Sequence, residues 1–212
     1  MIKFEHIEVF NFERSLNGMR NPMESWSQSD SGYKIGLDYV NRYTIGEKDM
    51  NLALKLVKAG SEHAKFMRQI FVSIDITAPD YWWKEYATYK IGTVENSTST
   101  MHKITSRLLT ENDFSIDEWD ASDIGMLNNL NELIFKYKNQ EVKDKKLWRK
   151  IIQKLPMSFN YKRTCTNNYQ GLRNMYFQRN HHKLQEWLDF CKMIEKLPYS
   201  ELIIVVRDKN KE

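Results

Sequence analysis

A run of short hydroxyl side chains is the feature of this sequence that most directly suggests chemistry. The stretch "GTVENSTST", Gly92 to Thr100, ends in the consecutive hydroxyl residues Ser97, Thr98, Ser99 and Thr100. Short hydroxyl side chains and an accessible backbone suit a phosphate group, which backbone N–H groups bind well at the start of a helix. A solvated surface loop has the same composition, and no Walker-type or GxGxxG glycine pattern accompanies the run. Composition alone leaves both interpretations open.

An aromatic and basic segment, "YWWKEYATYK", leads into this run. Trp82, Tyr86 and Tyr89 recur at helical spacing, which is typical of core packing and also of a platform for a base or flavin ring. We expect Trp82 and Tyr86 to pack in the core. We expect Tyr89 and Lys90, which adjoin the polar run, to face a ligand.

A second group of polar residues lies near the C-terminus, on a segment with helical periodicity. Asn168, Asn174 and Arg179 follow one another there. Arginine offers a planar fork to phosphate, and asparagine offers a donor and an acceptor to the imide of a pyrimidine or flavin. The alternative is that these side chains face water.

The sequence gives little support for a metal site or for a catalytic nucleophile. Cys165, His181, His182 and Cys191 match no common zinc-ligand spacing, and Cys191 falls on an apolar helical stripe. A Cys/His nucleophile and base is no better supported, and neither a GxSxG motif nor a pair of catalytic carboxylates stands out. We therefore assign no metal ligand and no catalytic residue.

Composition sets the remaining bounds. The chain has 212 residues and a formal net charge of +4, with 32 basic and 28 acidic residues. This length suits a single domain, 1–212, and the even charge balance argues against a nucleic-acid partner. Only 2 cysteines are present, so we expect a reducing compartment. No signal peptide or membrane span is evident, and we expect a cytoplasmic protein without a membrane partner.

Periodicity predicts an α+β class with early strands and a helix-rich second half. Strands are expected at residues 2–12 and 66–79, and a third, short one at 201–206. A polar, turn-rich loop is expected at 17–36 and a helix from Glu47 to a stop at Gly60. Further helices are expected over 80–90, from a cap at Ser122 to Tyr137, over 148–155, 167–179 and 181–197.

Two segments together resemble the flavin-dependent thymidylate synthases, the ThyX family. The first is "LVKAGSEH…FVSIDITAP…YWWKEYATYKIGTVENSTST", and the second is "LP…TNNYQGLRNMYFQRNHHKLQEW". The second matches that family's L-P…T-x-N-x-x-x-L-x-N-x-x-x-x-R without a gap, at Leu155, Pro156, Thr166, Asn168, Leu172, Asn174 and Arg179. The resemblance covers about half of the chain and implies a ThyX-like fold with antiparallel strands.

The first segment departs from the family motif R-H-R-x-x-S-x-N-E-x-S-x-R-Y. Aligned without gaps, R-H-R falls on Thr88, Tyr89 and Lys90, and N-E falls on Glu95 and Asn96 in inverted order. The second motif serine falls on Thr98, and the last motif arginine falls on Thr100. The hydroxyls, the amide and acid pair, and one basic residue remain.

The resemblance implies a set of ligands and site residues. Nucleotide (dUMP) binding falls to Lys90, Glu95, Asn96, Ser97, Thr98, Ser99, Thr100 and Arg179. FAD binding falls to His63, Thr88, Tyr89, Lys90, Ile91, Asn168 and Asn174. It also implies NADPH and methylenetetrahydrofolate as co-substrates and a homotetramer whose subunits complete one another's sites. The alternative is a ThyX-fold protein that binds nucleotides or assembles without catalysis.

Overall fold

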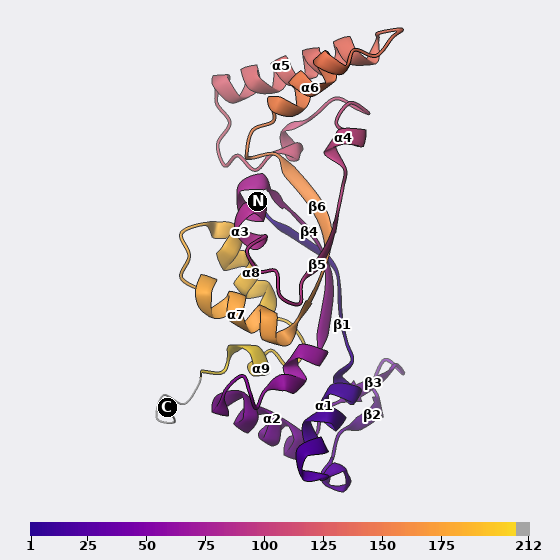
Figure 1. Cartoon of the computed structure of the whole chain (residues 1–212), viewed down its shortest axis with the longest axis vertical. Coiled ribbons are helices and arrows are strands. Elements are labelled where there is room, and N and C mark those ends of the chain that lie inside the picture. The colour runs from indigo at the N-terminus through magenta and orange to yellow at the C-terminus, as the bar shows by residue number, and fades with distance from the viewer. Residues whose placement is uncertain (207–212) are drawn as a thin grey trace. The chain divides into compact units, whose positions relative to one another are not determined.

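The computed structural model describes residues 1–206, and Figure 1 labels its helices and strands. The strands are β1 (Lys3–Phe10), β2 (Gly32–Ile35), β3 (Asn41–Thr44), β4 (Phe71–Pro79), β5 (Val94–Ser97) and β6 (Asn160–Asn168). The α-helices are α1 (Phe12–Arg20), α2 (Glu47–Ala59), α3 (Asp80–Tyr86), α4 (Thr100–Lys103), α5 (Ala121–Lys138), α6 (Lys145–Gln153), α7 (Tyr169–Arg179), α8 (Gln185–Glu195) and α9 (Glu201–Ile204). Short 3-10 helices are η1 (Asn21–Met23), η2 (Trp26–Gln28), η3 (Lys65–Gln69) and η4 (Glu111–Asp113).

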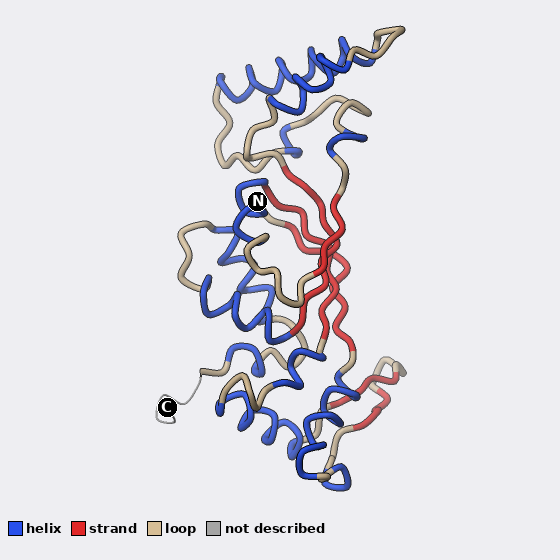
Figure 2. The backbone as a smooth tube through the Cα atoms, viewed as in Figure 1, coloured by secondary structure: helices blue, strands red, loops and turns tan. Residues whose placement is uncertain are grey.

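The strands form a four-stranded sheet in the order β1-β4-β6-β5 and a separate antiparallel hairpin of β2 and β3 (Figure 2). Helices follow from α5 onward, with β6 between α6 and α7. This confirms the expected α+β class with early strands and a helix-rich second half. No helix within residues 1–206 combines the length and apolarity that crossing a membrane requires.

The chain divides into two compact units. Unit 1 comprises Met1–Glu5, Asp75–Thr88 and Glu95–Thr164, and unit 2 comprises His6–Ile74, Tyr89–Val94 and the chain from Cys165 onward. Strands β1, β4 and β6 contribute residues to both units. The single domain expected over residues 1–212 stays a prediction.

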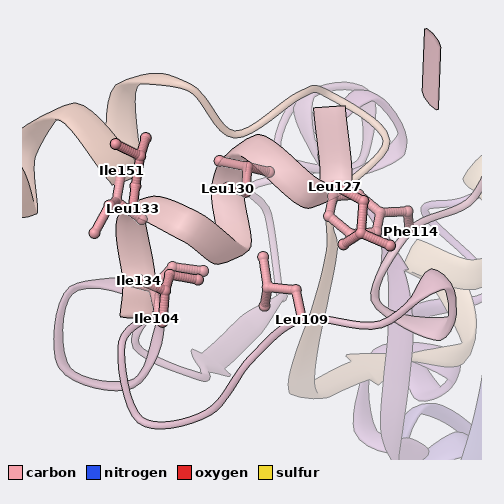
Figure 3. Packing of buried hydrophobic residues seen from close by; sticks show 8 residues of the cluster. All are labelled: Ile104, Leu109, Phe114, Leu127, Leu130, Leu133, Ile134 and Ile151. Atoms are coloured by element: carbon pink, nitrogen blue, oxygen red, sulfur yellow. The ribbon is translucent and has the colours of Figure 1, made fainter. Parts of the chain in front are cut away.

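The core of unit 1 joins α5 and α6. The chain that leads from α4 to α5 carries Ile104 and Leu109, which Figure 3 shows next to Ile134 and Leu130 of α5. The first turn of α5 is closed by Asp120, whose carboxylate accepts hydrogen bonds from the backbone of Ser122 and Asp123. We expected Ser122 as the cap. It is instead the second residue of α5, and its backbone N–H is one of the groups at the start of a helix that need an acceptor.

The aromatic residues of α3 form a second packed cluster in unit 1. Trp82 and Tyr86 are stacked with ring centroids 4.9 Å apart, and Trp83 meets both edge-on. Trp82 and Tyr86 are 0% and 1% exposed, which confirms that they belong to the core rather than to a ligand platform. The indole N–H of Trp83 donates to the carbonyl of Ala78 at 2.9 Å, so this buried polar atom is satisfied.

Strand β4 carries the apolar alternation that the sequence predicts. Ile70, Val72, Ile74 and Ile76 are all buried, while the residues between them are half-buried or exposed. Pro79 ends β4 and is the N-cap of α3, also as expected. Helix α2 ends at Ala59 with Gly60 as its C-cap, again at the predicted stop.

Several segments differ from expectation. Residues 12–20 are the helix α1, where a strand was expected to end at residue 12 and a loop to begin at residue 17, and residues 32–35 of that expected loop are the strand β2. Residues 94–97 are the strand β5, and residues 160–168 are the strand β6. Residues 201–204 form the helix α9 rather than a strand, and they bury Leu202 and Ile203 next to each other. The burial of two consecutive side chains fits a helix rather than a strand, in which neighbouring side chains point to opposite faces. Helix α9 packs against α7 and α8 in unit 2. Tertiary packing overrides local preference in such short segments.

A buried ion pair joins α1 to α2 in unit 2. Arg20 Nε donates to Asp49 Oδ1 at 2.6 Å, and the hydroxyls of Ser29 and Ser31 donate to the other carboxylate oxygen. The two charged side chains are 5% and 0% exposed. Burial by itself raises the pKa of Asp49, but the hydrogen bonds from Ser29, Ser31 and Arg20 outweigh it and leave that pKa below its ordinary value.

The tight turn at Gly92, which precedes β5, packs in unit 2 against the junction of β6 and α7. Gly92 has φ +74°, and a Cβ atom added there would lie 2.4 Å from Asn168 Nδ2. Asn168 is the N-cap of α7, where its Oδ1 accepts the N–H of Gly171 at 2.8 Å. Beside it, the Thr93 hydroxyl meets Asn167 Oδ1 at 3.0 Å. Glycine is required at position 92 by both its conformation and its contact.

Substituting Asp49 by Asn should destabilise the protein by about 3–5 kcal/mol at neutral pH, because the charge of Arg20 is left buried without its counter-ion. Urea denaturation measures the loss. A folded-state pKa below the unfolded one contributes stability that is present above the unfolded pKa and lost as pH falls through the folded pKa. The gap between wild type and Asp49→Asn should therefore shrink below about pH 4. Asp38→Asn, which removes the exposed pair with Arg42, is the control. A gap that is independent of pH would contradict the assignment.

Replacing Gly92 with Ala should cost about 2 kcal/mol or more, because a side chain in this left-handed conformation is strained and Asn168 must move from the cap of α7. Gly125→Ala is the matched control, since Gly125 lies within α5 with nothing within 4 Å of an added Cβ. The control should stabilise the protein by about 0.5–1 kcal/mol, as expected for Gly to Ala inside a helix. Thermal unfolding of both variants distinguishes them, and an unchanged Gly92→Ala would show that the turn can relax.

Candidate functional site

The hydroxyl run lies beside a cavity in unit 1. Thr98, Ser99 and Thr100 line a cavity of about 290 Å³ at the end of β5 and the start of α4. Ser97 is outside this lining, and its hydroxyl bonds to the carbonyl of Thr98 at 3.1 Å. The backbone N–H of Thr98 is occupied by the carbonyl of Lys162 at 2.9 Å. The run therefore presents side-chain hydroxyls to the cavity.

Three basic residues share this cavity: Lys103, Arg107 and Lys162. Arg107 is paired with Asp113, and Lys162 lies 3.0 Å from Glu5 and 3.2 Å from Asp75. Within residues 1–206, Lys103 has no ion-pair partner and is exposed.

The ion pairs of Arg107 and Lys162 keep both side chains charged, and the paired carboxylates offset their positive charge. Hydrogen bonds to Glu5 and then to Asp75 raise the pKa of Lys162. Burial acts to raise the pKa of Asp113, but its bonds with Arg107 and with the backbone of Thr110 bring that pKa below the ordinary range. Lys103 is therefore the cation with the least compensated charge, and an anion in this cavity would meet it together with the hydroxyls.

The amide and acid pair of the run does not face that cavity. Glu95 accepts a hydrogen bond from Arg163 at 2.7 Å. The guanidinium of Arg163 lies 4.3 Å from the ring centroid of Trp83, so this cation both contacts the indole ring and is paired with Glu95. Asn96 is exposed. Both stay predictions as nucleotide-binding residues.

The segment that aligns with the family's R-H-R spans the end of α3 and the turn after it. Thr88 closes α3, with its hydroxyl donating to the carbonyl of Glu85 at 2.7 Å. Lys90 and Ile91 are exposed, and the exposed fraction of Ile91 is 94%. A branched apolar side chain this open is available to a ligand or a partner surface. The structure leaves their assignment to FAD as a prediction.

Tyr89 and Arg179, predicted separately, are in direct contact within unit 2. Arg179 Nε donates to the hydroxyl of Tyr89 at 2.8 Å, and that hydroxyl donates to Gln178 Oε1 at 3.0 Å. The guanidinium lies over the ring of Trp187, 4.7 Å from its centroid. A cation over an indole ring and a charge-assisted hydrogen bond together hold this arginine in one place.

The two asparagines of the C-terminal motif have structural partners. Asn168 is 9% exposed and caps α7 while lying against Gly92. Asn174 is exposed on α7, where its Oδ1 accepts a hydrogen bond from Gln170 at 3.0 Å. The exposed face of α7 therefore offers Asn174 to a ligand more readily than Asn168.

His63 lines a larger cavity in unit 2, of about 560 Å³. Leu52, Leu56 and Phe66 supply an apolar wall, and the polar groups that line it beside His63 are Ser25, Gln28, Arg20, Glu62 and Lys65. Cavities of this size with apolar walls and a few polar groups are typical of cofactor and small-molecule sites. Among the described residues, no group of three or more His, Cys, Asp or Glu side chains is arranged to hold a metal ion.

Several residues of these clusters were not predicted from the sequence. Lys103 lies in the "MHKITSR" segment that directly follows the run, so its proximity was a usable signal. Lys162 could not be found, because β6 was not predicted as a strand. Trp187 lies within the helix expected over 181–197, and nothing in the sequence paired it with Arg179.

No protein-family model matches the sequence, and no curated protein matches it significantly. The structure, in contrast, is similar to solved structures over nearly its whole length. Thymidylate synthase X (ThyX) from Helicobacter pylori, with FAD and dUMP, has a TM-score of 0.72 at 15% identity, covering 96% of this chain and 97% of that one. A second such complex gives a TM-score of 0.71 at 15% identity, with 98% and 99% covered.

A UMP/dUMP methylase, PolB from Streptomyces cacaoi, bound with 5-Br dUMP, is similar at a TM-score of 0.58. Its identity is 13%, with 92% of this chain and 88% of that chain covered. Three solved structures of two proteins thus share the arrangement of helices and strands described above, at 13–15% sequence identity. The chain has the fold of the flavin-dependent thymidylate synthases.

Proposed function

We propose that this protein is a divergent ThyX-like enzyme that reductively methylates dUMP or a related pyrimidine nucleotide, using FAD, methylenetetrahydrofolate and NADPH. The observation that carries the proposal is the cavity at the end of β5, where the predicted phosphate-binding hydroxyls of Thr98, Ser99 and Thr100 lie beside Lys103. Hydroxyls and a cation in a partly enclosed site suit the phosphate of a nucleotide. Structures with this fold hold dUMP or 5-Br dUMP.

The residues present also fit a flavin nucleotide in part. The cavity beside His63 has an apolar wall for a planar ring, and the exposed Lys90 offers a positive charge to a phosphate. When bound, the flavin would supply the redox chemistry of the reaction. The chain's own groups would bind and orient ligands within each unit: in unit 1 the hydroxyls and Lys103 at a nucleotide phosphate, and in unit 2 Arg179 at an anionic or carbonyl oxygen and Asn174 at a ring imide.

The proposed assembly is a homotetramer, because in this family the motif loop and the C-terminal Asn and Arg often come from different subunits. The second candidate function is a nucleotide-binding or assembly protein without catalysis. The replacement of the family's first two motif residues by Thr88 and Tyr89 favours this alternative, since it removes charge that the family places at its flavin. Nucleotide binding is common to both candidates, and flavin binding separates them.

The first functional prediction is that the purified protein binds FAD. Bound flavin should give visible absorption bands, and FAD at about 100 times its Kd should stabilise the fold by about 2.7 kcal/mol, which a thermal shift detects. His63→Ala should weaken FAD binding, whereas Lys55→Ala, an exposed change on α2, should not. A colourless protein without a thermal shift in added FAD would favour the non-catalytic candidate.

The second functional prediction concerns dUMP. Arg179→Ala should weaken dUMP binding about 10- to 100-fold, the effect of losing a charge-assisted hydrogen bond, and Arg179→Lys should recover part of it. Lys103→Ala should weaken binding about tenfold, and Ser99→Ala should have a smaller effect. Calorimetric titration measures each affinity.

The control for these variants is Arg14→Ala, which removes an exposed arginine of α1. It should leave dUMP affinity unchanged. If wild-type affinity for dUMP proved indifferent to Lys103 and to Arg179 alike, the proposed nucleotide site would be wrong, although the fold assignment would stand.

A further inference from the structure

Positive charge is concentrated in one short segment of unit 1. Residues 136–154, which run from the last turn of α5 through α6, contain eight basic and two acidic residues, a net charge of +6. The rest of the chain has a net charge of −2, since the total is +4. The even charge balance that argued against a nucleic-acid partner is an average over the chain and does not describe this segment. Its basic residues are Lys136, Lys138, Lys143, Lys145, Lys146, Arg149, Lys150 and Lys154.

Three of the eight basic side chains have structural partners. Lys143 Nζ donates to three backbone carbonyls at and just after the end of α5, and Lys138 and Lys154 each donate one hydrogen bond to a neighbouring segment. Within residues 1–206, none of the eight is paired with a carboxylate, and five exposed side chains have no hydrogen-bond partner either. These five are Lys136, Lys145, Lys146, Arg149 and Lys150.

The cations of α6 form two rows along the helix. Lys146, Lys150 and Lys154 are four residues apart, and Lys145 and Arg149 form a second row beside them. Residues four apart are neighbours on a helix, so each row sets like charges about 6 Å apart along the axis, which destabilises the helix. Lys145 and Lys146 also lie in the first turn, where the helix dipole disfavours positive charge and where α6 has no acidic residue. A bound polyanion would convert this repulsion into attraction.

The apolar residues of α6 face away from these rows. Ile151 is buried in the core that joins α5 and α6 (Figure 3), and Leu147 and Ile152 pack against that core. Trp148 is half-buried, and its indole N–H donates to the carbonyl of Met101 at 3.2 Å, which ties it to α4. The exposed residues of α6 are therefore all basic apart from one glutamine.

We propose that the exposed face of α6 binds the phosphate backbone of double-stranded nucleic acid without reading its sequence. Charge complementarity carries the assignment. A duplex has one negative charge per about 1.7 Å of its axis, and its neutralisation by basic side chains releases condensed counterions. Lysine heads on flexible stems neutralise phosphates and impose little geometry, so we expect little preference among sequences.

Three other anionic partners fit this face less well. A helix that lies on a membrane buries apolar side chains among the headgroups, but the apolar side of α6 is packed into unit 1. The buried centre of a protein interface is depleted in lysine and enriched in aromatic residues. A single strand adds base stacking on exposed aromatic rings, and Trp148, the one aromatic residue of α6, is tied to Met101.

Fluorescence anisotropy with a labelled duplex of about 20 base pairs tests the proposal on the full chain. The logarithm of the affinity should fall linearly with the logarithm of the salt concentration, with a slope of about −2 to −4 for two to four phosphate contacts. Two duplexes of unrelated sequence should bind equally well, and a single strand of the same length more weakly. No duplex binding at about 50 mM salt, or tighter binding of the single strand, would overturn the proposal.

The variant that tests the site combines Lys146→Gln with Lys150→Gln. Losing two phosphate contacts should reduce the steepness of the salt dependence by about 2 and weaken duplex binding at least about 10-fold at 0.1 M salt. The midpoint of thermal unfolding should not fall, because a like-charge pair is removed and glutamine favours helices about as well as lysine does. The matched control, Lys48→Gln with Lys55→Gln, removes two exposed lysines of α2 in unit 2 and should leave binding unchanged.

A second variant, Lys145→Gln with Arg149→Gln, removes the other row and should weaken binding similarly, which keeps the test valid if the first variant is unstable. Equal weakening by the α2 control would show that net charge alone matters and would overturn the site. Vesicles that contain phosphatidylserine form the membrane arm of the experiment. Binding to these vesicles without binding to the duplex would assign the face to a lipid surface and overturn the proposal. None of these measurements involves dUMP or FAD, so their outcome is independent of the proposed function.

Discussion

The close approach of Gly92 to Asn168 is the constraint on which the candidate site in unit 2 depends. A Cβ atom at position 92 would lie 2.4 Å from the Asn168 amide, so the chain can pass the start of α7 only as glycine. Because Asn168 also caps α7, one contact fixes both the turn that carries Tyr89 and the first turn of the helix that carries Arg179. With both segments fixed, the hydrogen bond between Tyr89 and Arg179 requires little additional conformational ordering of the chain.

Charge at the candidate site is arranged differently from the family motif that the sequence resembles. Thr88 closes a helix, Tyr89 holds an arginine, and of that triplet only Lys90 is basic. Other cations stand near the hydroxyl run instead: Lys103 follows it by one helical turn, and Lys162 comes from β6. Lys162 is ion-paired with both Glu5 and Asp75, so Lys103 is the cation of this cavity whose charge is least compensated.

The chemistry of these clusters is that of binding and orientation. Hydroxyls, a lysine and a seated arginine hold anions and polarise oxygen atoms, and neither cluster contains a group with the activation expected of a nucleophile. The two cysteines illustrate this: both are buried, and burial raises the pKa of Cys191 to about 11, which keeps its thiol protonated.

The sequence by itself determined the elements with strong periodicity and clear boundaries. The alternation through Ile70, Val72, Ile74 and Ile76 marked β4, and Gly60 and Pro79 marked where α2 and β4 end, because the patterns reflect burial and backbone limits that are local. It also placed Tyr89, Arg179 and the hydroxyl run as candidates.

Tertiary structure decided the rest. Strands β5 and β6 lack local alternation and exist because they pair within a sheet, and α9 folds as a helix because its apolar residues pack on α7 and α8. The contact of Tyr89 with Arg179 spans 90 residues of sequence, and the cavity that gathers Lys103 and Lys162 depends on β6. Contacts of this range depend on how elements pack, which a local pattern of residues does not encode.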